Sequence, residues 1–233
     1  MYFVPARKGS ERIVGKNMRN LGGRPLIAWT FDAIIEAKAD PRGVIISSDD
    51  NEVLNLAHDF GFRTFVRPPF LCTSEAKMND VLFHHAQNFD GEDVMVLYPT
   101  SPFRRGREIE RAVAAWEVLG GPDKVLMSVE RVMHRPYGLM KIDEERCELN
   151  LMMPAGAMYY RAQGQPSLYR ANGAIYVIST SVMNTKRLDP QLFGPSTVPH
   201  VMGAIPSFEV DTEDDLTIAE AMCQTMRQAI HSR

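Results

Sequence analysis

The chain has 233 residues, 45% of them hydrophobic and 24% charged, which is the composition of one large globular domain or of a core domain with a subdomain. Its net charge of −3 argues against a general nucleic-acid-binding or membrane-binding surface, so its basic residues must act locally. The three cysteines form no CxxC pair, so we expect free thiols and a cytoplasmic protein. The histidines form no HExxH spacing, so we expect no histidine-based metal site. No apolar run reaches ~18 residues, so we expect no membrane span.

Short apolar runs alternate with amphipathic segments along the chain, which is typical of an α/β fold. The apolar runs are nearly continuous, as in strands that are buried on both faces. They predict strands at residues 2–5, 43–48, 63–68, 93–99 and 124–130. The amphipathic segments between them predict helices at residues 25–37, 51–60, 79–88 and 107–119.

The order of elements loosens after residue 132. Turn residues and a predicted hairpin at 138–152 suggest a small subdomain or an interface arm, so we divide the chain into a core of residues 1–132 and 171–233 and an arm of residues 133–170. The main sheet is predicted to resume at 171–179 and 202–210. Thr212 and Asp215 have the spacing of a capping box and predict the start of a final helix.

A loop rich in basic residues follows the first predicted strand. The five basic side chains are Arg7, Lys8, Arg12, Lys16 and Arg19. Such a loop can turn backbone N–H groups toward a phosphate chain, and Gly9 allows a close approach while Ser10 adds a hydroxyl donor. It is not an ordinary P-loop, because GSERIVGKN places five residues between the glycines and has Asn17 where a Ser or Thr would bind magnesium. The loop alone fits a phosphate site or a solvated basic turn.

Six motifs in a fixed order connect this loop to the rest of the chain. They are PARKGSERIVGKNMRNLGGRPLIAWT, SSDD, RPPFLCTSEAK, YPTSPFR, YRANGAIY and SFEVDTEDD. Their ordered combination resembles the acylneuraminate cytidylyltransferase, or CMP-sialic acid synthetase, family. The resemblance implies a Rossmann-like, doubly wound, mostly parallel sheet with an arm that pairs two protomers. It also implies transfer of CMP from CTP to the anomeric hydroxyl of a nonulosonic acid, with Mg²⁺ required.

The resemblance assigns the basic loop to the nucleotide. The nucleotide-binding residues implied by it are Arg7, Gly9, Ser10, Arg12, Lys16, Asn17 and Arg67. Arg7 and Lys16 would steady the triphosphate and offset the charge that gathers on the departing pyrophosphate. With Asp211, they are the predicted catalytic residues.

Two carboxylates close to the C-terminus are the predicted metal ligands. Glu209 and Asp211 are expected at the end of a strand with their side chains on one face, where they can bind one Mg²⁺. The competing interpretation is that Asp211 only helps to cap the final helix. Glu209 also departs from the family, which usually has an aspartate at this position.

The sugar side of the site departs further from the family. Its predicted residues are Tyr98, Ser101, Arg104, Arg170, Asn172 and Tyr176. Tyr98 stands where the family usually has glutamine, and a phenol offers a different set of hydrogen bonds from an amide. Ser74 replaces a usual aspartate in the loop after Arg67. The reaction class is therefore better determined than the acceptor.

Three alternatives stay open at this point. The acceptor could be another sugar acid or a sugar 1-phosphate, or the nucleotide could be GTP. A GT-A-type glycosyltransferase is a second class, although its acidic motif usually lies in the middle of the chain. A non-catalytic binding homologue is the third. We expect no nucleic-acid or membrane partner, and a homodimer.

Overall fold

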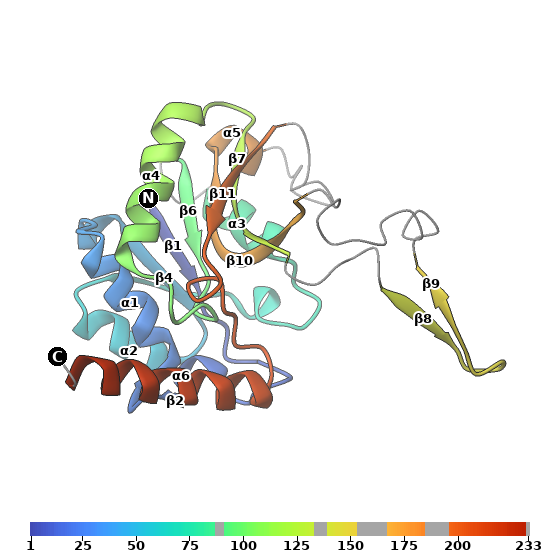
Figure 1. The fold of residues 1–233 in the computed structure, drawn as a ribbon. Helices are drawn as coiled ribbons and strands as arrows, with labels where there is room; N and C mark the ends of the chain where they lie inside the picture. Colours follow the sequence, from blue (N-terminus) through green and yellow to red (C-terminus); the bar gives the residue numbers. More distant parts are fainter. Residues whose placement is uncertain (87–90, 133–138, 153–166, 185–195, 232–233) are drawn as a thin grey trace.

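The computed structural model describes residues 1–86, 91–132, 139–152, 167–184 and 196–231. A seven-stranded sheet lies at its centre (Figure 1). In spatial order its strands are β11 (Thr197–Met202), β7 (Val125–Arg131), β10 (Tyr169–Ile178), β6 (Val94–Leu97), β1 (Tyr2–Pro5), β4 (Val44–Ser48) and β5 (Arg63–Val66). The helices are α1 (Leu26–Glu36), α2 (Asn51–Asp59), α3 (Met78–Ala86), α4 (Gly106–Leu119), α5 (Thr180–Asn184) and α6 (Glu213–His231).

The sheet is mostly parallel. Strand β1 pairs in parallel with β4 and β6, β4 pairs in parallel with β5, and β7 pairs in parallel with β11. Strand β10 is antiparallel to both of its neighbours, β6 and β7. The expected α/β architecture with a mostly parallel, doubly wound sheet is confirmed.

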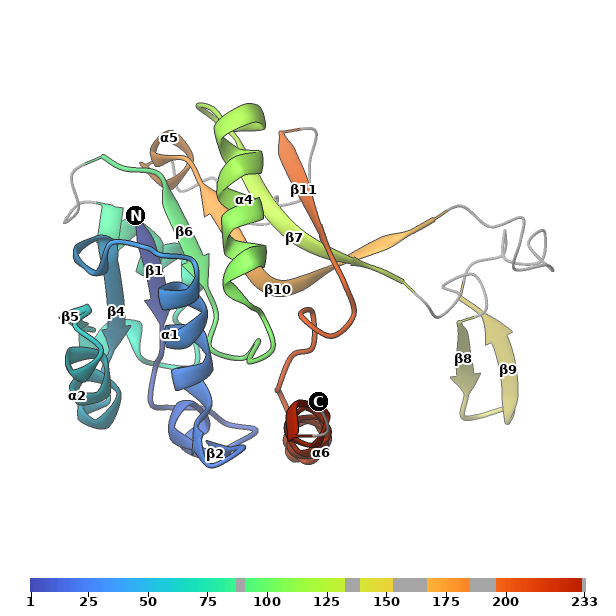
Figure 2. The same ribbon diagram turned by 60° about the vertical axis from the view of Figure 1, so that its left-hand side comes forward.

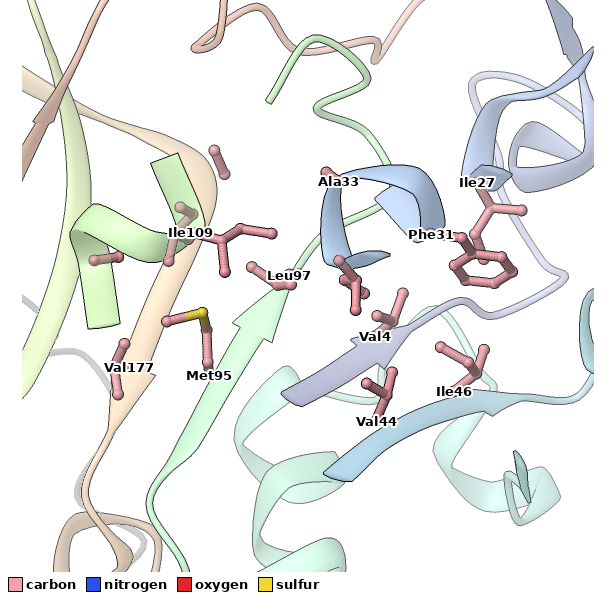
Figure 3. Packing of buried hydrophobic residues seen from close by; sticks show 14 of the residues in the cluster. Val4, Ile27, Phe31, Ala33, Val44, Ile46, Met95, Leu97, Ile109 and Val177 are labelled. Atoms are coloured by element: carbon pink, nitrogen blue, oxygen red, sulfur yellow. The ribbon is translucent and has the colours of Figure 1, made fainter. Parts of the chain in front are cut away.

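Helices cover both faces of the sheet, which explains why the strands have continuous apolar sequences. Val4 faces a core formed with α1, α2 and α4, while Phe3 faces a second core formed with α3 and α5. Figure 3 shows the first core, where Phe31 and Ile109 lie over the strands. Side chains alternate along a strand, so both faces need apolar residues, and each fully buried one contributes about 1.5–3 kcal/mol of stabilisation.

The five predicted N-terminal strands and the starts of the four predicted helices are confirmed to within two residues, while the predicted end of the third helix lies outside the described residues. The strand predicted at 202–210 is wrong. Residues 204–207 form turns, with the amide of Ser207 donating to the carbonyl of Gly203. Instead, residues 197–202 form the edge strand β11, which tolerates Pro199 because an edge position leaves its missing N–H without consequence.

The predicted hairpin in the arm is confirmed as β8 (Met140–Asp143) and β9 (Glu148–Leu151), which form a separate two-stranded antiparallel sheet. Figures 1 and 2 place it away from the central sheet. The rest of the arm lies mostly outside the described residues, so its boundaries stay a prediction. No helix in the described part of the chain is long and apolar enough to cross a membrane.

Helix α6 packs against the segment that follows β1. Its capping box is confirmed, since the amide of Thr212 donates to Asp215 Oδ2 at 2.8 Å and the amide of Asp215 donates to Thr212 Oγ1 at 3.2 Å. Leu216 and Cys223 of α6 share a buried cluster with Ile13 and Val210. In Figures 1 and 2, α6 lies beyond the end of the sheet toward which β1 points. The loop after β1 and the last helix are thereby brought together beyond the end of β1.

Candidate active site

A cleft of about 410 Å³ opens where β1, β5 and β6 end. Residues that directly follow these strands line it, namely Ala6 and Arg7, Arg67, and Tyr98 to Thr100. Neighbouring strands β1 and β6 lead away in opposite directions, because β1 is followed by β4 on one side and β6 by strands on the other. This reversal is where doubly wound sheets bind ligands, and the volume suits a small molecule.

The basic loop forms one wall of the cleft. Of the predicted nucleotide residues, Arg7, Ser10, Arg12, Lys16, Asn17 and Arg67 line the cleft. Gly9 is not among the lining residues, and a Cβ built there would lie 3.8 Å from the carbonyl oxygen of Cys72. The structure thus gathers the cationic side chains of two separate motifs around one space.

Side-chain contacts hold the basic loop in place. Asn17 Nδ2 donates to the carbonyl of Arg7 at 3.0 Å, and Arg7 Nη1 donates to the carbonyl of Thr73 at 2.6 Å. Gly15 has φ +61° and directly precedes the short 3₁₀ helix Lys16–Met18. Glycine accepts this left-handed conformation without strain, so the turn can aim Lys16 inward.

The basic loop meets the acidic motif from the other end of the chain. Lys16 Nζ lies 2.8 Å from Asp211 Oδ1 and 3.2 Å from the carbonyl oxygen of Val210, although Lys16 and Asp211 are 195 residues apart. Arg12 Nη1 lies 3.2 Å from Asp211 Oδ2. Only 14% of the Lys16 side chain is exposed, so this charge-assisted pair is stronger than a surface pair.

This geometry argues against the capping interpretation of Asp211. Thr212 and Asp215 make the capping box of α6, whereas the Asp211 carboxylate points to Lys16 and Arg12. Only the backbone amide of Asp211 takes part at the helix start, donating to Asp215 Oδ2 at 3.0 Å.

Glu209 lies next to this ion pair, but not at the end of a strand as predicted. Residues 208–211 are not part of a strand, and the chain there is held by single contacts to the loop after β6. The amide of Val210 donates to the carbonyl of Thr100 at 2.8 Å, and Thr100 Oγ1 donates to Glu209 Oε1 at 3.1 Å. Burial, and then the negative charge of Asp211, raise the pKa of Glu209.

The two carboxylates fit a magnesium ion that takes its other ligands from phosphate and water. Burial and the negative charge of Asp211 disfavour the ionised form of Glu209, and a bound cation would favour it. Among the described residues, no group of three or more acidic, histidine or cysteine side chains is arranged to hold a metal ion. A complete metal site made by the protein alone is therefore absent from this part of the chain.

The predicted sugar residues are not all at the cleft. Tyr98 lines it and, with Tyr176, also lines a smaller adjoining pocket, where their ring centroids are 6.0 Å apart. Ser101 and Asn172 are buried, and Asn172 Nδ2 donates to Ser207 Oγ at 2.7 Å. Arg170 is exposed and pairs with a glutamate at the ends of β7 and β10. All five assignments to the sugar stay predictions.

Arg104 is the predicted sugar residue placed deepest in the protein. It is 1% exposed, and its guanidinium donates to two backbone carbonyls and one threonine. It does not line the cleft. Burial lowers the pKa of Arg104 to about 9.

Two residues at the site escaped the sequence analysis. Thr100 lies inside the YPTSPFR motif, and its hydroxyl donates to Glu209. Gly173 has φ +69°, and a Cβ built on it would lie 3.2 Å from Glu209 Oε1. A glycine within a strand often marks a β-bulge or a close approach, and the register of β10 shifts here. The glycine of YRANGAIY, which lies within the strand predicted at 171–179, is therefore a sequence feature that could have indicated this close approach.

His85 is a buried packing residue of α3. Its ring lies 4.2 Å from that of Phe3, its Nε2 lies 3.1 Å from Ser47 Oγ, and the residue is 3% exposed. Burial, then the charges of Arg67 and His84, lower the pKa of His85 to about 3. His85 is therefore neutral in the folded protein at neutral pH.

This buried histidine predicts a loss of stability in acid. Because the folded-state pKa of His85 is about 3 and the unfolded value is 6.5, the unfolded chain takes up the proton first. Stability is complete above pH 6.5 and falls below it by up to about 1.4 kcal/mol per pH unit. Urea unfolding between pH 7.5 and 5 should show a shallower decline in His85→Gln than in wild type. An exposed-site control, His58→Gln, should keep the wild-type slope; equal slopes in all three proteins would contradict the prediction.

The fold and the cleft together define an α/β protein of the nucleotide-binding class. A family model described as cytidylyltransferase matches residues 1–228. The chain belongs to this cytidylyltransferase family and is a nucleotidyltransferase, which confirms the resemblance drawn from its motifs. Membership also favours this class over a GT-A-type glycosyltransferase.

Curated relatives and solved structures agree with this family. The chain is 28% identical to the CMP-N,N'-diacetyllegionaminic acid synthase of Legionella pneumophila, with 97% of both chains covered. It is 30% identical to the N-acylneuraminate cytidylyltransferase of Streptococcus agalactiae serotype V, over 91% of this chain but 50% of that protein. The chain thus spans about half the length of the streptococcal relative.

Among solved structures, the fold matches a CMP:2-keto-3-deoxy-manno-octonic acid synthetase complexed with CTP at a TM-score of 0.70 and 17% identity, covering 97% of this chain and 98% of that one. It also matches a 4-diphosphocytidyl-2C-methyl-D-erythritol synthase from Anaerococcus prevotii at a TM-score of 0.59 and 14% identity, covering 96% of each. At these identities the likeness shows the fold.

Proposed function

We propose that this protein transfers CMP from CTP to the anomeric hydroxyl of a nonulosonic acid and releases pyrophosphate. Lys16 and Arg12 line the cleft together with Arg7 and Arg67, and the observation that carries the proposal is the contact of Lys16 and Arg12 with Asp211. Cations for a triphosphate and carboxylates for its metal ion are thereby together at the switch point of the sheet. The printed names of the two relatives above support the cytidylyl group and a nonulosonic acceptor.

The basic residues would work by position and charge. Arg7, Arg12 and Lys16 would hold the triphosphate so that its α-phosphorus faces the incoming hydroxyl. As the bond to the leaving group breaks, negative charge gathers on pyrophosphate, and the preorganised cations stabilise it. The chemistry requires no covalent intermediate on the enzyme.

Asp211 and Glu209 would hold Mg²⁺, which supplies Lewis-acid charge stabilisation to the phosphate oxygens when bound. Lys16 and Arg12 neutralise Asp211 in the structure. An arriving triphosphate offers these two cations stronger partners, so nucleotide binding would free the Asp211 carboxylate for the metal ion.

The acceptor would lie beside Tyr98 and Tyr176, beyond the phosphate end of the cleft. The pKa of each phenol is raised, first by burial, so both hydroxyls stay protonated at neutral pH and can donate or accept hydrogen bonds. Phenol hydroxyls suit the hydroxyl and acylamino groups of a nonulosonic acid.

We further propose a homodimer formed through the hairpin β8–β9. Cross-strand pairing places Met140 beside Leu151 and Ile142 beside Leu149, so four apolar side chains share one face. All four are exposed by 40–66% in the single chain. An apolar face of this kind, on an element that stands away from the core, suits a matching face on a second copy.

Ile142→Asp should weaken this dimer by at least about tenfold in Kd, because it would bury a charge in the apolar face. Asn150→Asp adds the same charge on the opposite, polar face and should leave the dimer unchanged. Sedimentation velocity over a hundredfold range of concentration measures both. A monomeric wild type, or a dimer unaffected by Ile142→Asp, would refute the assignment.

Pyrophosphate release tests the proposed reaction directly. Each of CTP, GTP, UTP and ATP is incubated with Mg²⁺ and one member of a panel of nonulosonic acids, eight-carbon sugar acids and sugar 1-phosphates. We expect release with CTP and a nonulosonic acid only. Release with another acceptor or nucleotide would replace that part of the proposal. If no combination releases pyrophosphate but CTP still raises the melting temperature in a thermal-shift assay, the result would favour a non-catalytic homologue.

A further inference from the structure

Arg104 is a buried cation whose contacts are all neutral. Its Nη1 lies 2.7 Å from the carbonyl oxygen of Ala174 and 3.2 Å from that of Tyr98, and its Nη2 lies 2.8 Å from Thr30 Oγ1. Within the described part of the chain no carboxylate pairs with it, and the only cause of its lowered pKa is burial. Burying a guanidinium without a counterion is costly, so a simple packing role would be better served by an apolar residue.

The two carbonyls that Arg104 binds belong to segments far apart in the sequence. Tyr98 directly follows β6 and lines the cleft, while Ala174 lies in β10 where the register of that strand shifts. Thr30 adds a third element, helix α1. One rigid fork therefore joins three elements at the edge of the cleft.

Both carbonyls belong to residues close in sequence to those that contact Glu209. Two residues after Tyr98, Thr100 donates its hydroxyl to Glu209 and accepts the amide of Val210 through its carbonyl. Directly before Ala174, Gly173 brings its backbone against the Glu209 carboxylate. Arg104 thus binds the two backbone segments that contact Glu209. Because Asp211 follows two residues later, the same segments also help to place Asp211.

We propose that Arg104 is a positioning residue that sets the spacing of the acidic pair Glu209 and Asp211, and that it does not contact the sugar. This inference rests on the proposed function for the role of the acidic pair. It replaces the sugar-binding role that the motif alone suggested for Arg104. Residues that orient metal ligands through a second layer of contacts typically change metal affinity or activity by about 10–100-fold when they are removed.

Two variants and a control test this assignment. Arg104→Met keeps most of the buried volume but removes all donors, and Arg104→Lys keeps the charge but loses the fork, so it serves if the methionine variant fails to fold. Arg111→Met removes an exposed arginine on α4 as the control. Each protein is first shown to be folded by circular dichroism.

Amide hydrogen exchange gives the first readout, because it requires no substrate. In Arg104→Met, which lacks the guanidinium hydrogen bonds, the amide of Val210, which is bonded to Thr100, should exchange at least about tenfold faster than in wild type. In Arg111→Met the exchange rate should match wild type. Wild-type exchange at Val210 in a folded Arg104 variant overturns the proposal. This result is independent of whether wild type releases pyrophosphate, so failure of the proposed function is distinguished from failure of the positioning role.

Metal and substrate titrations give the second readout. Mn²⁺ binding in the presence of CTP, followed by electron paramagnetic resonance, should weaken at least about tenfold in Arg104→Met and recover partly in Arg104→Lys. The KM for the sugar acid should stay within about twofold of wild type. A raised KM for the sugar acid with unchanged Mn²⁺ affinity would instead make Arg104 a direct sugar contact.

Discussion

Lys16→Ala is expected to lower kcat by about 10²–10³-fold, which is the usual effect of removing one preorganised donor from a developing negative charge. Lys16 is held by Asp211 and by the carbonyl of Val210, so its ammonium group is fixed before any substrate arrives. The loss should appear in kcat more than in the KM for CTP, because Arg7 and Arg12 still hold the ground-state triphosphate.

Controls separate this effect from a loss of fold. Lys38→Ala removes an exposed lysine beyond the far end of α1 and should leave kcat unchanged. Lys16→Arg keeps the charge and should recover part of the rate. Steady-state pyrophosphate release measures all three variants, and a turnover near that of wild type in Lys16→Ala would remove Lys16 from the reaction.

Asp211→Asn should raise the Mg²⁺ concentration needed for half-maximal rate by at least about tenfold and lower kcat at saturating metal. The amide keeps the shape of the side chain but loses the charge, so it binds a hard cation poorly and leaves Lys16 and Arg12 without their partner. The pKa of Glu209 should also fall, because burial still raises it but the negative charge of Asp211 no longer does.

Asp214→Asn is the matched control, because Asp214 is an exposed acidic residue three positions away in the first turn of α6. It changes the same net charge and should leave the Mg²⁺ titration as in wild type. If Asp211→Asn also gives an unchanged titration, then Asp211 is not a metal ligand and its role is confined to holding Lys16.

Strands β1, β4 and β6 could be predicted from the sequence because they are buried on both faces and therefore read as continuous apolar runs. The edge strand β11 could not, because its exposed edge admits Pro199 and alternating residues that resemble a loop. The predicted strand over 202–210 failed for the converse reason. Its apolar residues serve the core cluster around Val210 without pairing in the sheet.

The candidate site shows the same division. Motif order brought Lys16 and Asp211 into one hypothesis, but no local pattern encodes that they touch, since the contact depends on α6 packing beside the first loop. Arg104 shows the limit most clearly. The YPTSPFR motif predicts that Arg104 lies close to the cleft. Its burial and its hydrogen-bond partners depend on Thr30 and Ala174, which are far from Arg104 in the sequence.

The topology of the sheet also dictates an order of assembly during synthesis. Strands β1, β4, β5 and β6 can pair with one another as soon as they emerge, but both partners of β7 come later in the chain. Strand β7 must therefore wait for β10 to insert between it and β6, across the long excursion of the arm. Closing so long a loop is slow. Because β10 carries the glycine beneath Glu209, the acidic half of the site is completed only when nearly the whole chain has been made, so a prematurely terminated chain could fold in part without being able to react.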